Sequence, residues 1–241
     1  MSTTAFGEAE RVHTSVSAEL ERRCLIWIAA RLPPWVNSDH LTALALAAML
    51  MTGVSYALAR SHRWALLLVV VALAVNWFGD SLDGTLARVR RQQRPRYGFY
   101  VDHIVDCFGV LFLVGGLALS GFMSPLVAMG LLVAYFMLSI EIYLATYCLT
   151  VFRLAFWGFG GTELRIVLAI GTVKLLFNPM ATVLGHRYLL FDIGGTVAIA
   201  GIAVTLVVSV IRNMRALYRA EPLPVPAMAD LKAESTTARV A

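Results

Sequence analysis

Charged residues are scarce in this chain, and cysteines are few and scattered. Only 15% of the 241 residues are charged, whereas 59% are hydrophobic and the mean hydropathy is +0.74. A soluble domain is nearer about 45–50% apolar and about 25% charged, so the composition excludes an ordinary soluble domain. Three cysteines without a CxxC pair indicate neither a disulfide framework nor a zinc site. The first residues also lack a basic stretch followed by an apolar core, and we therefore expect no cleavable signal peptide.

Basic residues give the chain a net charge of +5, but they are concentrated beside the apolar runs. One group lies between the second and third runs, one before the first and one after the last: Arg88, Arg90, Arg91, Arg94 and Arg96; Arg22, Arg23 and Arg31; Arg212, Arg215 and Arg219. This distribution follows the positive-inside rule, and it suits anionic lipid surfaces or phosphorylated substrates. It argues against nucleic acid as a partner.

The apolar runs predict an all-α integral membrane protein with six transmembrane helices. We place them at about 41–60, 64–88, 98–120, 124–151, 163–178 and 191–211, with a helix break at 177–187. Residues 15–31 predict an amphipathic helix in the membrane interface. We expect a flexible N-terminus at 1–14, one membrane domain at 15–215 and a disordered tail at 216–241. An even number of spans would put both termini and the arginine-rich loop on the cytoplasmic side.

Four aspartates lie between the second and third runs, in the stretch GDSLDGTLARVRRQQRPRYGFYVDHIVD. A charge at membrane depth costs about 2.5–3.5 kcal/mol on insertion scales, so this cluster needs compensation. Asp80 and Asp83 share a helix face at i, i+3, and Asp102 and Asp106 share another at i, i+4. If the two helices are antiparallel neighbours, the carboxylates converge. One or two hard divalent cations would then neutralise them and form a clamp for phosphoryl chemistry.

The residues around the aspartates suit a phosphorylated ligand. Gly84 and Gly98 lack a Cβ, so a bulky ligand can approach the backbone. Arg88 offers a fork of donors to a pyrophosphate. The full pattern, DxxDGxxARx(9)GxxxDxxxD from Asp80 to Asp106, resembles the motif of the CDP-alcohol phosphotransferases, which are membrane enzymes with six helices. From average composition, its eight fixed positions would coincide by chance on the order of 10⁻¹⁰ times per starting point.

The resemblance implies an enzyme of phospholipid synthesis that transfers a substituted phosphate group from a CDP-alcohol to an acceptor hydroxyl and releases CMP. It implies Mg²⁺ or Mn²⁺, with two ions bound, and it implies a possible homodimer. It assigns metal ligation to four residues, with the last also acting as general base: Asp80, Asp83, Asp102 and Asp106. It assigns the CDP site to a set that includes one residue before the first span: Asn37, Asp83, Gly84, Ala87, Arg88 and Gly98.

Two further likenesses point to the choline/ethanolamine phosphotransferase branch. His103 directly follows Asp102, as it does in that branch, where it is a candidate base for a diacylglycerol hydroxyl; an incidental interfacial histidine is the alternative. Glu141 and Thr146, in EIYLATY, resemble an acceptor segment of the same branch. An intramembrane glutamate is a functional candidate by default, although pairing with another span would also explain it.

Other candidate residues have equally good structural explanations. Asn37 and Thr42, in NSDHLT, resemble the family's segment at the start of the first span, near the nucleotide, but helix capping accounts for the stretch as well. Glu163 and Arg165, in GGTELR, could line the acceptor pocket or could cap a helix and interact with its dipole.

The substrates stay open at this point. CDP-choline or CDP-ethanolamine could donate to diacylglycerol, which His103 and Glu141 slightly favour. Alternatively, CDP-diacylglycerol could donate to a small alcohol such as inositol phosphate, glycerol phosphate or serine. A cation-coupled transporter would place its site near the bilayer midplane between internal repeats, which this sequence does not suggest. An inactive CDP-lipid-binding protein is disfavoured because no motif aspartate is missing.

Overall fold

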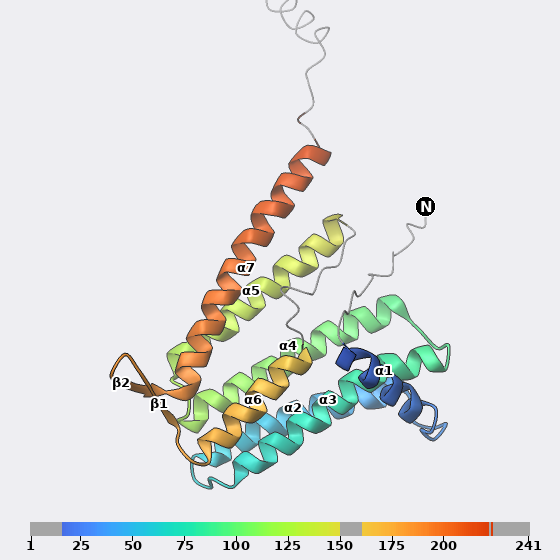
Figure 1. Cartoon of the computed structure of the whole chain (residues 1–241). Helices are drawn as coiled ribbons and strands as arrows, with labels where there is room; N and C mark the ends of the chain where they lie inside the picture. Colours follow the sequence, from blue (N-terminus) through green and yellow to red (C-terminus); the bar gives the residue numbers. More distant parts are fainter. Residues whose placement is uncertain (1–15, 150–160, 222, 224–241) are drawn as a thin grey trace, which may run out of the picture.

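The computed structural model describes residues 16–149, 161–221 and 223, and these residues form seven helices and one short hairpin (Figure 1). The predicted flexible N-terminus and most of the predicted tail lie outside the described residues. In chain order the elements are α1 (Val16–Ala29), α2 (Ser38–Ala59), α3 (Ala65–Val89), α4 (Pro95–Ser120), α5 (Pro125–Leu149), α6 (Gly161–Leu175), β1 (Met180–Val183), β2 (His186–Leu189) and α7 (Leu190–Ala220).

The prediction of an all-α, multi-pass membrane protein is confirmed. Five helices are long and apolar enough to cross a membrane: α2, α3, α4, α5 and α7. In α5 and α7 only 11% of the apolar window is buried inside the chain, so most of their apolar side chains are available to lipid. The fifth predicted span, at 163–178, corresponds to α6, which has 15 residues and is not among these five helices. The count of six is therefore approximate.

The predicted helix break at 177–187 is confirmed, but a hairpin rather than a simple turn follows it. Asn178 accepts a hydrogen bond from the backbone N–H of Met180 at 2.9 Å, just after α6 has ended. Strands β1 and β2 then pair antiparallel across Leu184 and Gly185, which both have positive φ, as a two-residue hairpin turn requires. Helix α7 continues to Ala220, nine residues beyond the expected 211, so the first residues of the predicted tail are helical.

Helix α2 lies at the centre of the site-bearing bundle, because it packs against both α3 and α4. Its contact with α4 is backbone to backbone. A Cβ on Gly116 would lie 2.1 Å from the carbonyl oxygen of Gly53, and a Cβ on Gly53 would lie 2.1 Å from the carbonyl oxygen of Phe112. Small residues allow membrane helices to approach this closely. Helix α6 is joined to the same bundle by the buried Tyr56 hydroxyl of α2, which hydrogen-bonds Thr172 at 2.5 Å.

Helix α1 packs on the motif-bearing end of α3. Leu25 and Ala29 are buried against Leu82 and Leu86, whereas Trp27 on the other face is exposed, which fits the predicted amphipathic helix. The turn between α1 and α2 is fixed by the Arg90 guanidinium, which donates to four of its backbone carbonyls: Leu32, Pro33, Pro34 and Val36. The chain just after α3 is therefore held against the start of α2.

Candidate active site

Three of the four motif aspartates converge in the structure. Asp80 comes from α3, Asp102 and Asp106 come from α4, and one carboxylate oxygen from each lies within 4.8 Å of the other two. The prediction was conditional on α3 and α4 being antiparallel neighbours, and the carboxylates do converge, although each of the two helices packs mainly on α2 along its described length. The carboxylates thus face one another across a space. Three carboxylate oxygens at this separation are a ligand set that fits a hard divalent cation.

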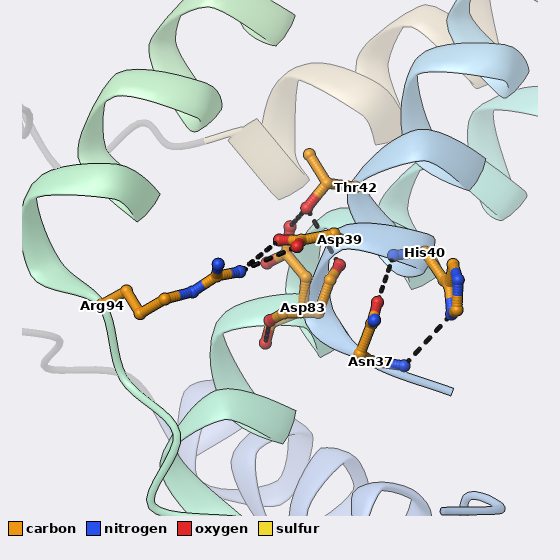
Figure 2. A network of polar contacts seen from close by, with 7 residues as sticks. Asn37, Asp39, His40, Thr42, Asp83 and Arg94 are labelled. Carbon is orange, nitrogen blue, oxygen red and sulfur yellow. Dashed lines mark hydrogen bonds and ion pairs between the residues drawn. The ribbon is translucent and has the colours of Figure 1, made fainter. Parts of the chain in front are cut away.

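Asp83 is directed toward α2 instead. Its Oδ2 accepts a hydrogen bond from Thr42 Oγ1 at 2.7 Å, and its Oδ1 accepts one from the Gly84 backbone N–H. Its backbone carbonyl accepts a third from the Ser38 hydroxyl. Figure 2 shows Thr42 and Asp83 approaching each other between the two helices. Asp83 is therefore anchored beside the three-carboxylate group, and its role as a metal ligand stays a prediction.

Arg165, at the beginning of α6, contacts the cluster directly. Its Nη2 donates to Asp80 Oδ2 at 2.7 Å, and its Nε donates to Asn76 Oδ1 at 2.7 Å. Asn76 in turn donates to the carbonyl of Ala45 at 3.0 Å. Asn76 and Asp80 lie one helical turn apart on the same face of α3, so a single guanidinium can bridge them. Sequence reasoning placed Arg165 at an acceptor pocket or a helix cap and did not connect it with Asp80.

A cavity of about 450 Å³ lies beside Asp83, between the start of α2, the end of α3 and the following loop; it is lined by Asn37, Ser38, Asp39, Leu86, Ala87, Gln92, Gln93 and Arg94. Asn37 also caps α2: its side chain accepts from the His40 N–H, and its own N–H donates to His40 Nδ1. Arg94 reaches across from the start of α4 to both Asp39 oxygens at 2.8 Å (Figure 2). Asn37 therefore acts as a cap while it also lines a cavity.

The motif glycines are not required by packing. A Cβ on Gly98 would meet no atom within 4 Å, and a Cβ on Gly84 would meet only the Arg88 guanidinium, at 3.5 Å. Arg88 donates to Thr85 at 3.1 Å on its own helix. Both glycines thus differ from Gly53, where a neighbouring backbone occupies the space that a side chain would need. Open space beside Gly84 and Gly98 is consistent with the approach of a ligand.

His103 lies one residue from Asp102 and is held by aromatic neighbours. Its Nδ1 is 2.6 Å from the Phe99 carbonyl oxygen, and its ring stacks on Phe99 with centroids 4.1 Å apart. Tyr143 of α5 approaches the ring edge-on at 5.1 Å. An Nδ1–H that donates to a carbonyl leaves the lone pair of a neutral imidazole on Nε2. This arrangement is compatible with a base.

The remaining acceptor candidates have partners outside the aspartate cluster. Glu141 accepts hydrogen bonds from Ser209 and Asn213 of α7 at 2.7–3.0 Å. Thr146 donates to the Ile142 carbonyl of its own helix. Glu163 lies in the first turn of α6. Arg165, the fourth acceptor candidate, differs from these residues in that it hydrogen-bonds a motif aspartate.

Sequence reasoning missed Asn76, which hydrogen-bonds Arg165. It also missed the ion pair between Asp39 and Arg94, which lines the cavity. Asn76 had a detectable signal, because it is a polar residue within an apolar run, four positions before Asp80. Asp39 and Arg94 are 55 positions apart, and nothing in either local pattern connects them.

Comparison with known protein families finds a match that covers most of the chain. The family model for CDP-alcohol phosphatidyltransferase matches residues 35–211, which include the whole motif and run from the start of α2 into α7. A search of the curated proteins finds no match to the chain.

Proposed function

Because the chain belongs to the CDP-alcohol phosphatidyltransferase family, whose members transfer a phosphate group from a CDP-alcohol, we propose that it is a metal-dependent enzyme of membrane phospholipid synthesis. In the proposed reaction an acceptor hydroxyl attacks the β-phosphorus of the CDP-alcohol. The bond from that phosphorus to the bridging oxygen breaks, and CMP leaves with the electron pair. The substituted phosphate passes to the acceptor, and the hydroxyl proton passes to the enzyme.

The observation that carries the proposal is the convergence of Asp80, Asp102 and Asp106 within 4.8 Å. With Asp83 beside them, these carboxylates would hold Mg²⁺ or Mn²⁺, and we propose two ions. Such ions, when bound, neutralise phosphate charge on the attacked and leaving groups. The family uses divalent metals, and the oxygen-only ligand set is the kind that these hard cations prefer.

The other motif residues would bind and orient the donor. We propose that the CDP moiety lies along the open side of Gly84 and Gly98 and that Arg88 donates to its phosphates. Ala87 and Asn37, which line the cavity next to Asp83, would contact the nucleotide. Holding both reactants in line is the main contribution that a protein can make to phosphoryl transfer.

We propose Asp106 as the general base and His103 as a second candidate for that role. Asp106 belongs to the carboxylate group, and His103 lies next to Asp102 with Nδ1 directed at a backbone carbonyl. The histidine favours CDP-choline or CDP-ethanolamine as donor and diacylglycerol as acceptor. CDP-diacylglycerol with a small alcohol is the second arrangement. Glu141, Thr146, Glu163 and Arg165 are the residues proposed for the acceptor side.

We also propose that the aspartates and both termini face the cytoplasm, because the arginines of the α3–α4 loop lie at this end of the bundle. The homodimer implied by the family resemblance stays a prediction.

The test uses the purified full-length protein in detergent or nanodiscs. Each labelled donor (CDP-choline, CDP-ethanolamine or CDP-diacylglycerol) is incubated with diacylglycerol or with a small alcohol, and CMP and lipid products are measured by mass spectrometry. We expect CMP release that EDTA abolishes and that Mg²⁺ or Mn²⁺ restores. Asp102→Asn should lose it. Absence of CMP from every donor and acceptor pair, with metal supplied to a folded protein, would refute the enzyme assignment.

A further inference from the structure

The Arg165 side chain occupies a defined place in the aspartate cluster. It is 19% exposed and joins Asp80, which is 32% exposed, at 2.7 Å. Its second contact, with Asn76, fixes the plane of the guanidinium, because the Asn76 amide is itself oriented by the Ala45 carbonyl. Asn76 is 5% exposed. The arginine is thus held by a buried polar chain that runs from α2 through α3, and it does not depend on Asp80 alone.

The charge balance of the aspartate cluster explains why the contact between Arg165 and Asp80 matters. Three carboxylates within 4.8 Å of one another repel, and Asp83 adds a fourth negative charge nearby. A positive group is needed whenever a divalent ion is not bound. The Arg165 guanidinium supplies positive charge to this group through its ion pair with Asp80.

We propose that Arg165 is a resident counter-cation of the aspartate cluster. It holds Asp80 and offsets carboxylate repulsion in the metal-free protein, and, because its charge has the same sign as the metal, it lowers the affinity for the divalent ion. Arg165 would therefore keep the ion exchangeable and the empty cluster folded. This inference rests on the proposed function only in that it takes the aspartates to be metal ligands.

Two other roles for the same contact predict different results. If Arg165 served mainly to orient Asp80 for the metal, its loss would weaken metal binding, as the loss of outer-shell partners commonly does. If it served only to tie α6 to α3, its loss would lower stability equally with and without metal. A counter-cation predicts the opposite change in metal affinity and a stability loss that metal reverses.

The experiment measures Mn²⁺ binding to metal-free, full-length protein in detergent, with free Mn²⁺ followed by its electron paramagnetic resonance signal. In Arg165→Gln we expect Mn²⁺ to bind about 10-fold more tightly or better, since even in the dielectric of water a +1 charge beside a +2 charge changes a binding constant by about that factor. Arg165→Lys retains the charge and should bind Mn²⁺ within about 3-fold of the original protein, on the same electrostatic reasoning.

Thermal unfolding supplies the second readout. Without metal, Arg165→Gln should unfold at a lower temperature than the original protein, and saturating Mn²⁺ should narrow the difference, because tighter binding to the folded state adds stability by mass action. Arg63→Gln is the matched control. Arg63 also donates to α6, but at its far end, through the Leu175 carbonyl at 2.8 Å. Its loss should leave Mn²⁺ affinity unchanged.

The outcomes separate this inference from the proposed function. Unchanged or weaker Mn²⁺ binding in Arg165→Gln overturns the counter-cation role while the metal site stands. A stability difference that Mn²⁺ does not narrow also overturns it. A third outcome is that the original protein binds no Mn²⁺, so that Asp80→Asn cannot change Mn²⁺ binding. In that case the metal site of the proposed function is refuted, and the inference is refuted with it.

Discussion

The contact between Gly53 of α2 and Gly116 of α4 gives a sharp prediction for Gly116→Ala. The added Cβ would lie 2.1 Å from the Gly53 carbonyl oxygen and 2.4 Å from its Cα, far inside the 3.4 Å at which ordinary contact begins. Both obstructing atoms belong to a backbone, so no side-chain rotation can relieve the clash. The helices must move apart by roughly an ångström, and α4 would carry its aspartates with it.

Overpacking of this kind typically costs about 1–3 kcal/mol, and a rigid backbone neighbour places this case at the upper end. For a chain of this size we expect the unfolding temperature to fall by about 3–10 °C. CMP release should fall as well, because Asp102 and Asp106 would shift relative to Asp80. Thermal unfolding of purified protein measures the first effect, and the donor assay measures the second.

Gly115→Ala is the matched control, because a Cβ there would meet no atom within 4 Å. The same substitution one residue earlier should be neutral or should stabilise α4 slightly, by up to about 1 kcal/mol from helix propensity. Equal effects of the two substitutions would refute the argument, since they would show that the backbone contact between α2 and α4 does not limit what α4 can accommodate.

Three further predictions concern single side chains. Asp106→Asn should lower turnover at least about 100-fold, the usual range for loss of a general base, while gel filtration and thermal unfolding show an intact fold; full activity would exclude Asp106 as the base. Thr42→Val removes the 2.7 Å hydrogen bond to Asp83. A hydrogen bond to a charged group contributes roughly 1.5–3 kcal/mol, so we expect kcat/KM for the CDP donor to fall at least about 10-fold. Thr52→Val is the control and should leave kcat/KM unchanged, because the Thr52 hydroxyl donates to the Ala48 carbonyl of its own helix. Tyr56→Phe removes a buried hydrogen bond to α6 and should cost about 1 kcal/mol of stability with little loss of turnover; an unchanged unfolding temperature would contradict this.

The helical architecture could be predicted from the sequence because hydrophobic length alone specifies spans in a bilayer. The expected spans at 41–60 and 64–88 differ from α2 and α3 by no more than three residues at any end. Local periodicity also predicted which aspartates share a helix face, because i, i+3 and i, i+4 spacings fix this. Their convergence followed from it only on the condition that α3 and α4 are antiparallel neighbours.

Contacts between distant segments could not be predicted in this way. Arg165 and Asp80 are 85 residues apart, and the pairing depends on how α6 packs against α3. The separation of α3 from α4 depends on α2, whose glycine contact with α4 has no local signature. Asp83 was expected among the metal ligands, and its bond to Thr42 arises from the crossing of α2 and α3. Packing in three dimensions decides each of these features.

The β1–β2 hairpin makes the sidedness of the protein measurable. Helix α6 begins beside Asp80, through Arg165, and ends beside Arg63 at Leu175, so the hairpin that follows lies at the opposite end of the bundle from the aspartates (Figure 1). Leu184 at its tip is 95% exposed. A reporter cysteine at this position, in a chain freed of its native cysteines, would be reached by a membrane-impermeant reagent from only one side of a sealed vesicle. The aspartates would then face the opposite side of the membrane, and that side would be the compartment that supplies the nucleotide substrate.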